Sequence, residues 1–130
     1  ESDVSLELDD PSIVFCGDLL WNAMFPNFVD AIPSKLNASV HALRRSRETT
    51  YVPGHGAIAH AADFDRYVAM LGEIERQARA AHAAGTSAKD AADAFKLPAS
   101  VGEWALFNPA SKAFYQRAFE AWNKELGASQ

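Results

Sequence analysis

Two stretches, Ile13-Val14-Phe15-Cys16-Gly17-Asp18 and Tyr51-Val52-Pro53-Gly54-His55-Gly56, decide the expected fold. The first begins as a continuous run of apolar, β-branched and aromatic residues, which is typical of an inner strand covered on both faces. The second continues a short strand that we expect to begin at Thr49. Both strands end beside glycine and a side chain that can bind a metal ion. The segment between them decides how the two strands are connected.

A helix is expected between the two strands, from about residue 34 to residue 47. Its apolar residues recur at helical spacing, at Leu36, Val40 and Leu43. Strand, helix and strand over about 40 residues predict a βαβ unit with parallel strands. Because parallel strands end at the same edge of a sheet, Asp18 and His55 are expected to lie close together.

The remaining segments predict one more strand and three more helices. Apolar and polar residues alternate over residues 4–9, which predicts a strand buried on one face. Residues 19–33 are expected to form an irregular, aromatic loop. We expect helices over residues 62–84, from Ser87 to Phe95, and from an N-cap at Asn108-Pro109 to Gly127.

Composition favours a compact soluble protein. The chain has 130 residues, of which 48% are hydrophobic and 22% charged, as in one globular domain or a large part of one. The net charge of −5 comes without a basic stripe, so we expect no nucleic-acid partner. No apolar run reaches the roughly 18 residues of a membrane span. The single cysteine, Cys16, leaves the compartment open between cytoplasm and periplasm.

The carboxylate of Asp18 and the imidazole of His55 suit zinc, manganese or iron. A carboxylate can also bridge two ions, and neighbouring glycines allow the backbone to turn tightly around such ligands. Taken alone, however, a Gly-Asp pair after a strand is more often a turn. The two motifs together are the stronger indication of a metal site.

The order Gly17-Asp18, helix, Pro53-Gly54-His55-Gly56 resembles the second half of the metallo-β-lactamase superfamily, with glyoxalase II-like motifs. The resemblance implies an α/β fold: half of an αββα sandwich, a small mixed sheet with packed helices and a helical C-terminal tail. It places the half-domain at residues 1–85 and a helical extension packed on it at residues 86–130. By position, Asp18 would bridge two metal ions and His55 would bind the second.

The resemblance further implies that most of the site lies outside this sequence. The family's His-x-His-x-Asp-His motif is missing, and Glu1-Ser2-Asp3 contains no histidine, so we expect a fragment with two of seven usual ligands. Alone it is expected to be inactive. The complete protein would be a hydrolase, most simply with two zinc ions, although iron or manganese also fits. A metal-bound hydroxide would attack an ester, thioester, lactam or related bond of a small-molecule substrate.

Large apolar residues after Asp18 are candidates for pocket lining, with core packing as the equally weighted alternative. They are Trp21, Met24, Phe25 and Phe28, and His60 is a further candidate near the mouth of the site. His41 and His82 are interpreted as surface or packing residues.

A second hypothesis concerns association. Half a sandwich leaves one apolar face uncovered, and large apolar patches usually find a partner. The chain would then be a non-catalytic half-domain that pairs with a second copy of itself or with an N-terminal half.

Overall fold

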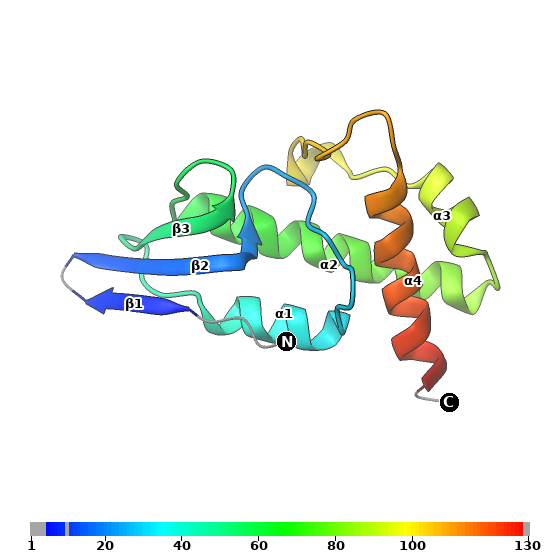
Figure 1. Ribbon diagram of the computed structural model, residues 1–130, viewed down its shortest axis with the longest axis horizontal. Coiled ribbons are helices and arrows are strands. Elements are labelled where there is room, and N and C mark those ends of the chain that lie inside the picture. The colour runs from blue at the N-terminus through cyan, green and yellow to red at the C-terminus, as the bar shows by residue number, and fades with distance from the viewer. Residues whose placement is uncertain (1–4, 10, 129–130) are drawn as a thin grey trace.

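A computed structural model describes residues 5–9 and 11–128 of the chain. Over these residues the protein is a mixed α/β structure with a three-stranded sheet and four α-helices (Figure 1). The elements are β1 (Leu6–Asp9), β2 (Ser12–Trp21), α1 (Pro33–Ala42), β3 (Thr50–His55), α2 (Ala61–Ala83), α3 (Ala88–Ala94), the 3-10 helix η1 (Ala99–Val101) and α4 (Ala113–Ala128).

The sheet has the order β1-β2-β3. β1 pairs antiparallel with β2, whereas β2 pairs parallel with β3, so the sheet is mixed. Helix α1 connects the two parallel strands, which confirms the predicted βαβ unit. The ends of β2 and β3 that carry Asp18 and His55 therefore lie at the same end of the sheet.

Strand β2 is longer than predicted. It continues past Gly17 to Trp21, and its register with β3 shifts between Phe15 and Gly17 and again between Gly17 and Trp21. Gly17 has a φ of 55°, a left-handed conformation that glycine adopts without a steric penalty. This irregularity lets the strand continue while changing the direction of the side chains that follow, as bulges do.

The predicted start of the last helix at Asn108-Pro109 is wrong, because α4 begins only at Ala113. The Asn108 side chain accepts a hydrogen bond from the Ala110 N–H at 3.1 Å, and its carbonyl accepts one from the Ser111 N–H. Asparagine is well suited to such local turns, and here the turn uses the groups that would otherwise cap a helix. The Ser111 hydroxyl instead accepts from the Ala113 N–H at 3.1 Å.

Helix α1 is shorter than predicted and ends at Ala42, with Leu43 as its C-cap. The other helices lie near their expected positions. Helix α2 ends just before Gly85, which has a φ of 71°, and the Ser87 hydroxyl caps α3 by accepting from the Asp90 N–H.

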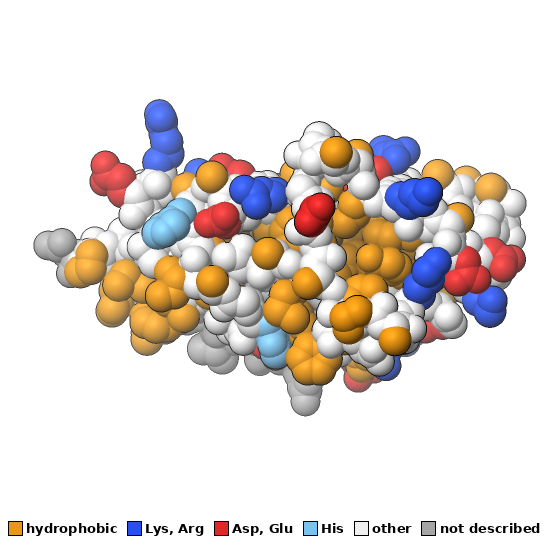
Figure 2. All heavy atoms as spheres, turned by 90° about the horizontal axis from the view of Figure 1, so that it is seen from above, with side chains coloured by type: hydrophobic (Ala, Val, Ile, Leu, Met, Phe, Trp, Pro, Cys, Tyr) orange, Lys and Arg blue, Asp and Glu red, His pale blue; other side chains and the backbone are white. Residues whose placement is uncertain are grey.

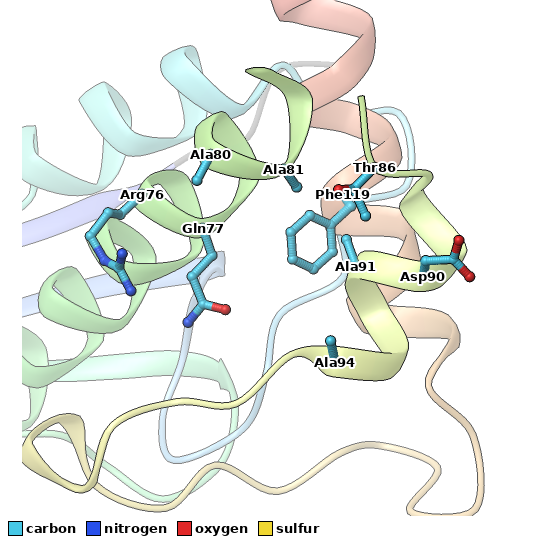
Figure 3. A pocket seen from close by; sticks show the side chains of 9 residues that line it. All are labelled: Arg76, Gln77, Ala80, Ala81, Thr86, Asp90, Ala91, Ala94 and Phe119. Atoms are coloured by element: carbon cyan, nitrogen blue, oxygen red, sulfur yellow. The ribbon is translucent and has the colours of Figure 1, made fainter. Parts of the chain in front are cut away.

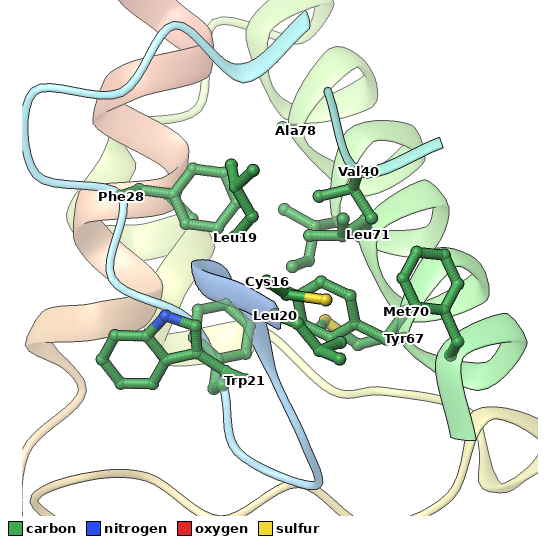
Figure 4. Close-up of a cluster of buried hydrophobic side chains, with 14 of the residues drawn as sticks. Cys16, Leu19, Leu20, Trp21, Phe28, Val40, Tyr67, Met70, Leu71 and Ala78 are labelled. Carbon is green, nitrogen blue, oxygen red and sulfur yellow. The ribbon is translucent and has the colours of Figure 1, made fainter. Parts of the chain in front are cut away.

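One hydrophobic core runs through both the sheet region and the C-terminal helices. Cys16, Leu20 and Val40 pack with Tyr67, Met70 and Leu71 of α2 (Figure 4). The same cluster includes Phe119 and Trp122 of α4, which are 2% and 1% exposed. Helix α4 thus contributes buried side chains to the core around α2.

Within the described residues, no helix combines the length and the apolar character needed to cross a bilayer.

The outer face of the sheet stays apolar and accessible. Leu6 and Leu8 of β1 pair with Phe15 and Ile13 of β2, so all four side chains share one face. Leu6, Leu8 and Phe15 are 60%, 47% and 39% exposed, so the predictions that the first strand is buried on one face and the second is covered on both faces are wrong. Hydrophobic side chains gather at the sheet end of the molecule in Figure 2. On β2, Val14 and Cys16 alternate with these residues and are buried in the core.

Burial makes Cys16 a test of this packing. Its side chain is 0% exposed, and desolvation raises the pKa of the thiol from 9.0 to about 11. We expect iodoacetamide at pH 8 to label Cys16 in urea but not in the folded protein, because the reactive thiolate is both scarce and enclosed. The raised folded-state pKa also means that stability is lost as the pH rises from about 9 to 11. Rapid native labelling, or an identical alkaline loss of stability in Cys16→Ala, would contradict this packing.

Candidate metal site

Asp18 and His55 meet at the end of the parallel strand pair. Nε2 of His55 lies 3.5 Å from Oδ1 of Asp18. The two side chains are 35% and 68% exposed, respectively, so the pair is accessible from outside the protein. The predicted proximity of Asp18 and His55 is therefore confirmed.

The imidazole of His55 is held by its neighbours. Trp21 stacks on it, with ring centroids 3.9 Å apart and planes 28° apart. The indole N–H of Trp21 donates to the Asp18 carbonyl at 2.9 Å, so one side chain contacts both halves of the pair. The Asn22 backbone N–H donates to the His55 carbonyl at 2.9 Å, and the Asn22 side chain donates to the Ala57 carbonyl. These contacts fix the loop that follows β3 as well as the imidazole ring of His55.

The glycines on either side of His55 permit the close approach. A Cβ at Gly54 would lie 2.4 Å from Oδ1 of Asp18 and 2.7 Å from the Gly17 carbonyl oxygen. A Cβ at Gly56 would lie 2.2 Å from the Asn22 carbonyl oxygen, and Gly56 has a φ of 91°. All three distances are shorter than a real Cβ atom shows to a neighbouring atom. Positions 54 and 56 therefore require glycine for steric reasons.

The pair has a geometry that fits one ion. Two ligand atoms at 2.0 to 2.2 Å from a tetrahedral zinc ion lie about 3.3 to 3.6 Å apart. The observed separation of 3.5 Å falls in this range without any movement of the side chains.

Residues 5–9 and 11–128 contain no group of three or more His, Cys, Asp or Glu side chains arranged to hold a metal ion. Asp18 and His55 form a pair of candidate ligands within this part of the chain. A catalytic zinc site typically uses three protein ligands and a water.

The other candidate residues have different positions. Phe25 and Phe28 are 1% and 2% exposed and belong to the core. Met24 is half-buried and forms an isolated bridge with Ala105. His60 is exposed and is the N-cap of α2, where its backbone N–H donates to the Asp63 carboxylate at 2.9 Å.

Two surface hollows lie away from the pair. One, of about 270 Å³, is open to the surface and lies between α2, α3 and α4, beside Phe119 (Figure 3). The other, of about 810 Å³, lies between the segment that begins at Phe28 and α4. Neither is lined by Asp18 or His55.

Phe107 lies beside His55, although the sequence did not indicate it as a candidate site residue. Its ring lies edge-on to that of His55 with centroids 6.3 Å apart. It belongs to the irregular segment before α4, where no periodic pattern singles out one residue, and it is distant from both motifs in sequence.

Comparison of the chain with models of known protein families gives no match. Comparison with curated protein sequences gives none either.

Gly54 provides a direct test of the close approach. We expect Gly54→Ala to lower the free energy of unfolding by about 1–3 kcal/mol, because the new methyl group overlaps Asp18 and the Gly17 backbone. Gly72→Ala is the matched control: it lies inside α2 with open space around it, so it should stabilise the protein by up to about 1 kcal/mol. Urea denaturation midpoints measure both changes, and equal effects would show that β2 and β3 are not closely apposed at Gly54.

Proposed function

We propose that Asp18 and His55 are two ligands of a metal-dependent hydrolase centre, in its simplest form a dinuclear zinc centre. The observation that carries the proposal is the 3.5 Å separation of Oδ1 and Nε2, reached through a contact that only glycine permits at position 54. Zinc would suit this pair, and iron or manganese would suit it as well.

Asp18 and His55 would have distinct roles in this metal centre. His55 presents Nε2 toward Asp18, while stacking on Trp21 keeps its ring in that orientation. Asp18 has two carboxylate oxygens, so it is able to bridge two ions. Zinc held by these residues would supply a Lewis acid and would activate water near neutral pH for attack on an ester, thioester, lactam or related bond.

The remaining ligands would come from residues outside this sequence. The other histidines, His41, His60 and His82, join no group of ligands within the described residues. We propose that an upstream segment of the His-x-His-x-Asp-His type completes the centre, on the half-sandwich arrangement that the two motifs resemble. The chain alone would then bind metal weakly and show no hydrolysis.

The test uses a protein in which such an upstream segment is joined to this chain. We expect Asp18→Asn to remove bound zinc, iron or manganese and to lower ester or thioester hydrolysis more than about 100-fold, since even outer-shell changes cost 10 to 100-fold. Asp30→Asn is the control, because Asp30 is an exposed loop carboxylate with a φ of 57° that asparagine also tolerates. Elemental analysis and hydrolysis rates decide: unchanged metal content in Asp18→Asn would contradict the proposal.

A second candidate function is supported by the outer face of the sheet. Leu6, Leu8 and Phe15 form an exposed apolar surface, and among the residues that the structure describes β1 pairs on one side only, with β2. Exposed strand edges and apolar faces favour pairing with another chain. The chain would then be a half-domain that associates with a second copy or with a complementary half.

Sedimentation velocity tests self-association. We expect the chain to form a dimer whose dissociation constant rises at least about tenfold in Leu8→Lys, because a charge is placed in the apolar interface. The matched control is Ile58→Lys, which is 60% exposed on the loop after β3. A chain that remains monomeric at all concentrations would contradict the second copy as the partner.

A further inference from the structure

Phe107 is unusually exposed for an ordered aromatic residue next to a candidate metal ligand. Its side chain is 63% exposed, more than the other exposed phenylalanine, Phe15. It nevertheless has a defined neighbour in His55, at 6.3 Å between ring centroids and with planes 84° apart. Exposed aromatic surface at the edge of a binding site is available to a ligand.

The segment carrying Phe107 is tied to the chain that follows Asp18. The Ala105 N–H donates to the Ala23 carbonyl at 2.9 Å, and the Ala105 carbonyl accepts from the Phe25 N–H at 2.8 Å. These two hydrogen bonds place Phe107, two residues later, beside the metal-ligand pair. Part of the entropic cost of ordering a binding residue is therefore met before any ligand arrives.

The ring of Phe107 also has a phenylalanine neighbour in α4. Phe114, in α4, lies nearly parallel to Phe107, with planes 7° apart and centroids 6.3 Å apart. Phe114 also contacts Trp21 edge-on at 6.3 Å, and the Arg117 guanidinium lies over its ring at 5.3 Å. Trp21 in turn stacks on His55. The four rings thus form one connected aromatic cluster, of which Phe107 is the most exposed member.

We propose that Phe107 is a specificity-determining residue that binds the apolar acyl or aryl group of the substrate. This rests on the proposed function, because it places the reacting carbonyl at Asp18 and His55. The substrate class is an ester or thioester whose acyl part is apolar, such as a phenylacyl group, and not a small polar acyl group. Apolar contact with Phe107 removes its exposed surface from water, and flat groups pack well against an aromatic ring.

A binding measurement on this chain tests the proposal without any hydrolysis. The indole N–H signal of Trp21 is followed by NMR while phenylacetate or acetate is added to metal-free protein. Phenylacetate should bind at least about tenfold more tightly than acetate, and Phe107→Ala should abolish that preference. Phe107→Leu should retain part of it, since the leucine side chain is still apolar.

Val29→Ala is the control, because it removes an exposed apolar side chain from the hollow between the segment that begins at Phe28 and α4, away from the pair. It should leave the preference for phenylacetate unchanged. Equal affinities for the two carboxylates in the unmodified chain, or an equal loss in Val29→Ala and Phe107→Ala, would overturn the assignment of Phe107.

Failure of this proposal is distinguishable from failure of the metal site. If Asp18→Asn leaves the metal content unchanged while Phe107→Ala abolishes the preference for phenylacetate, the role of Phe107 in binding is supported and the proposed metal site is contradicted. If Asp18→Asn loses the metal but the unmodified chain binds phenylacetate no more tightly than acetate, only the assignment of Phe107 to the substrate's apolar group is wrong.

Discussion

The parallel pairing of β2 with β3 is the interaction on which the site depends. Gly17 lies opposite Pro53, and Trp21 lies opposite His55, so the strands approach each other where the candidate ligands are. That approach leaves no room for a side chain at Gly54, whose Cβ would overlap the Asp18 carboxylate. The backbone therefore sets the 3.5 Å distance between Oδ1 of Asp18 and Nε2 of His55.

Much of this arrangement is predictable because it depends on local patterns. The apolar run before Gly17, the helical spacing of Leu36, Val40 and Leu43, and the strand before His55 together predict the parallel unit, which the structure confirms. The continuation of β2 to Trp21 was not predicted, because it depends on pairing with β3 across a shift in register. The predicted start of α4 was wrong for a local reason: Asn108 is as suitable for a turn as for a helix cap, and its side chain and carbonyl accept from the Ala110 and Ser111 N–H groups in a turn.

Trp21 shows why residue roles near a site are harder to predict than elements. From its position after Asp18 it was equally a pocket residue or a core residue. In the structure it is 7% exposed and belongs to the core, yet it also stacks on His55 and donates to the Asp18 carbonyl. Phe107 is the opposite case, since the backbone hydrogen bonds of Ala105 and the ring contact with Phe114 bring it to the site. Such long-range tethers leave no periodic signal in the sequence.

The exposure of Asp18 connects the proposed metal site with the exposed apolar face of the sheet. A carboxylate that is 68% exposed is well solvated, so its attraction for a cation is weakened by water. A partner segment that supplied further ligands would also displace water from Asp18 and strengthen that attraction. The apolar face of Leu6, Leu8 and Phe15 offers binding energy for such a partner, independent of the metal. Covering the sheet and completing the metal centre would thus be thermodynamically coupled: each would increase the affinity of the other.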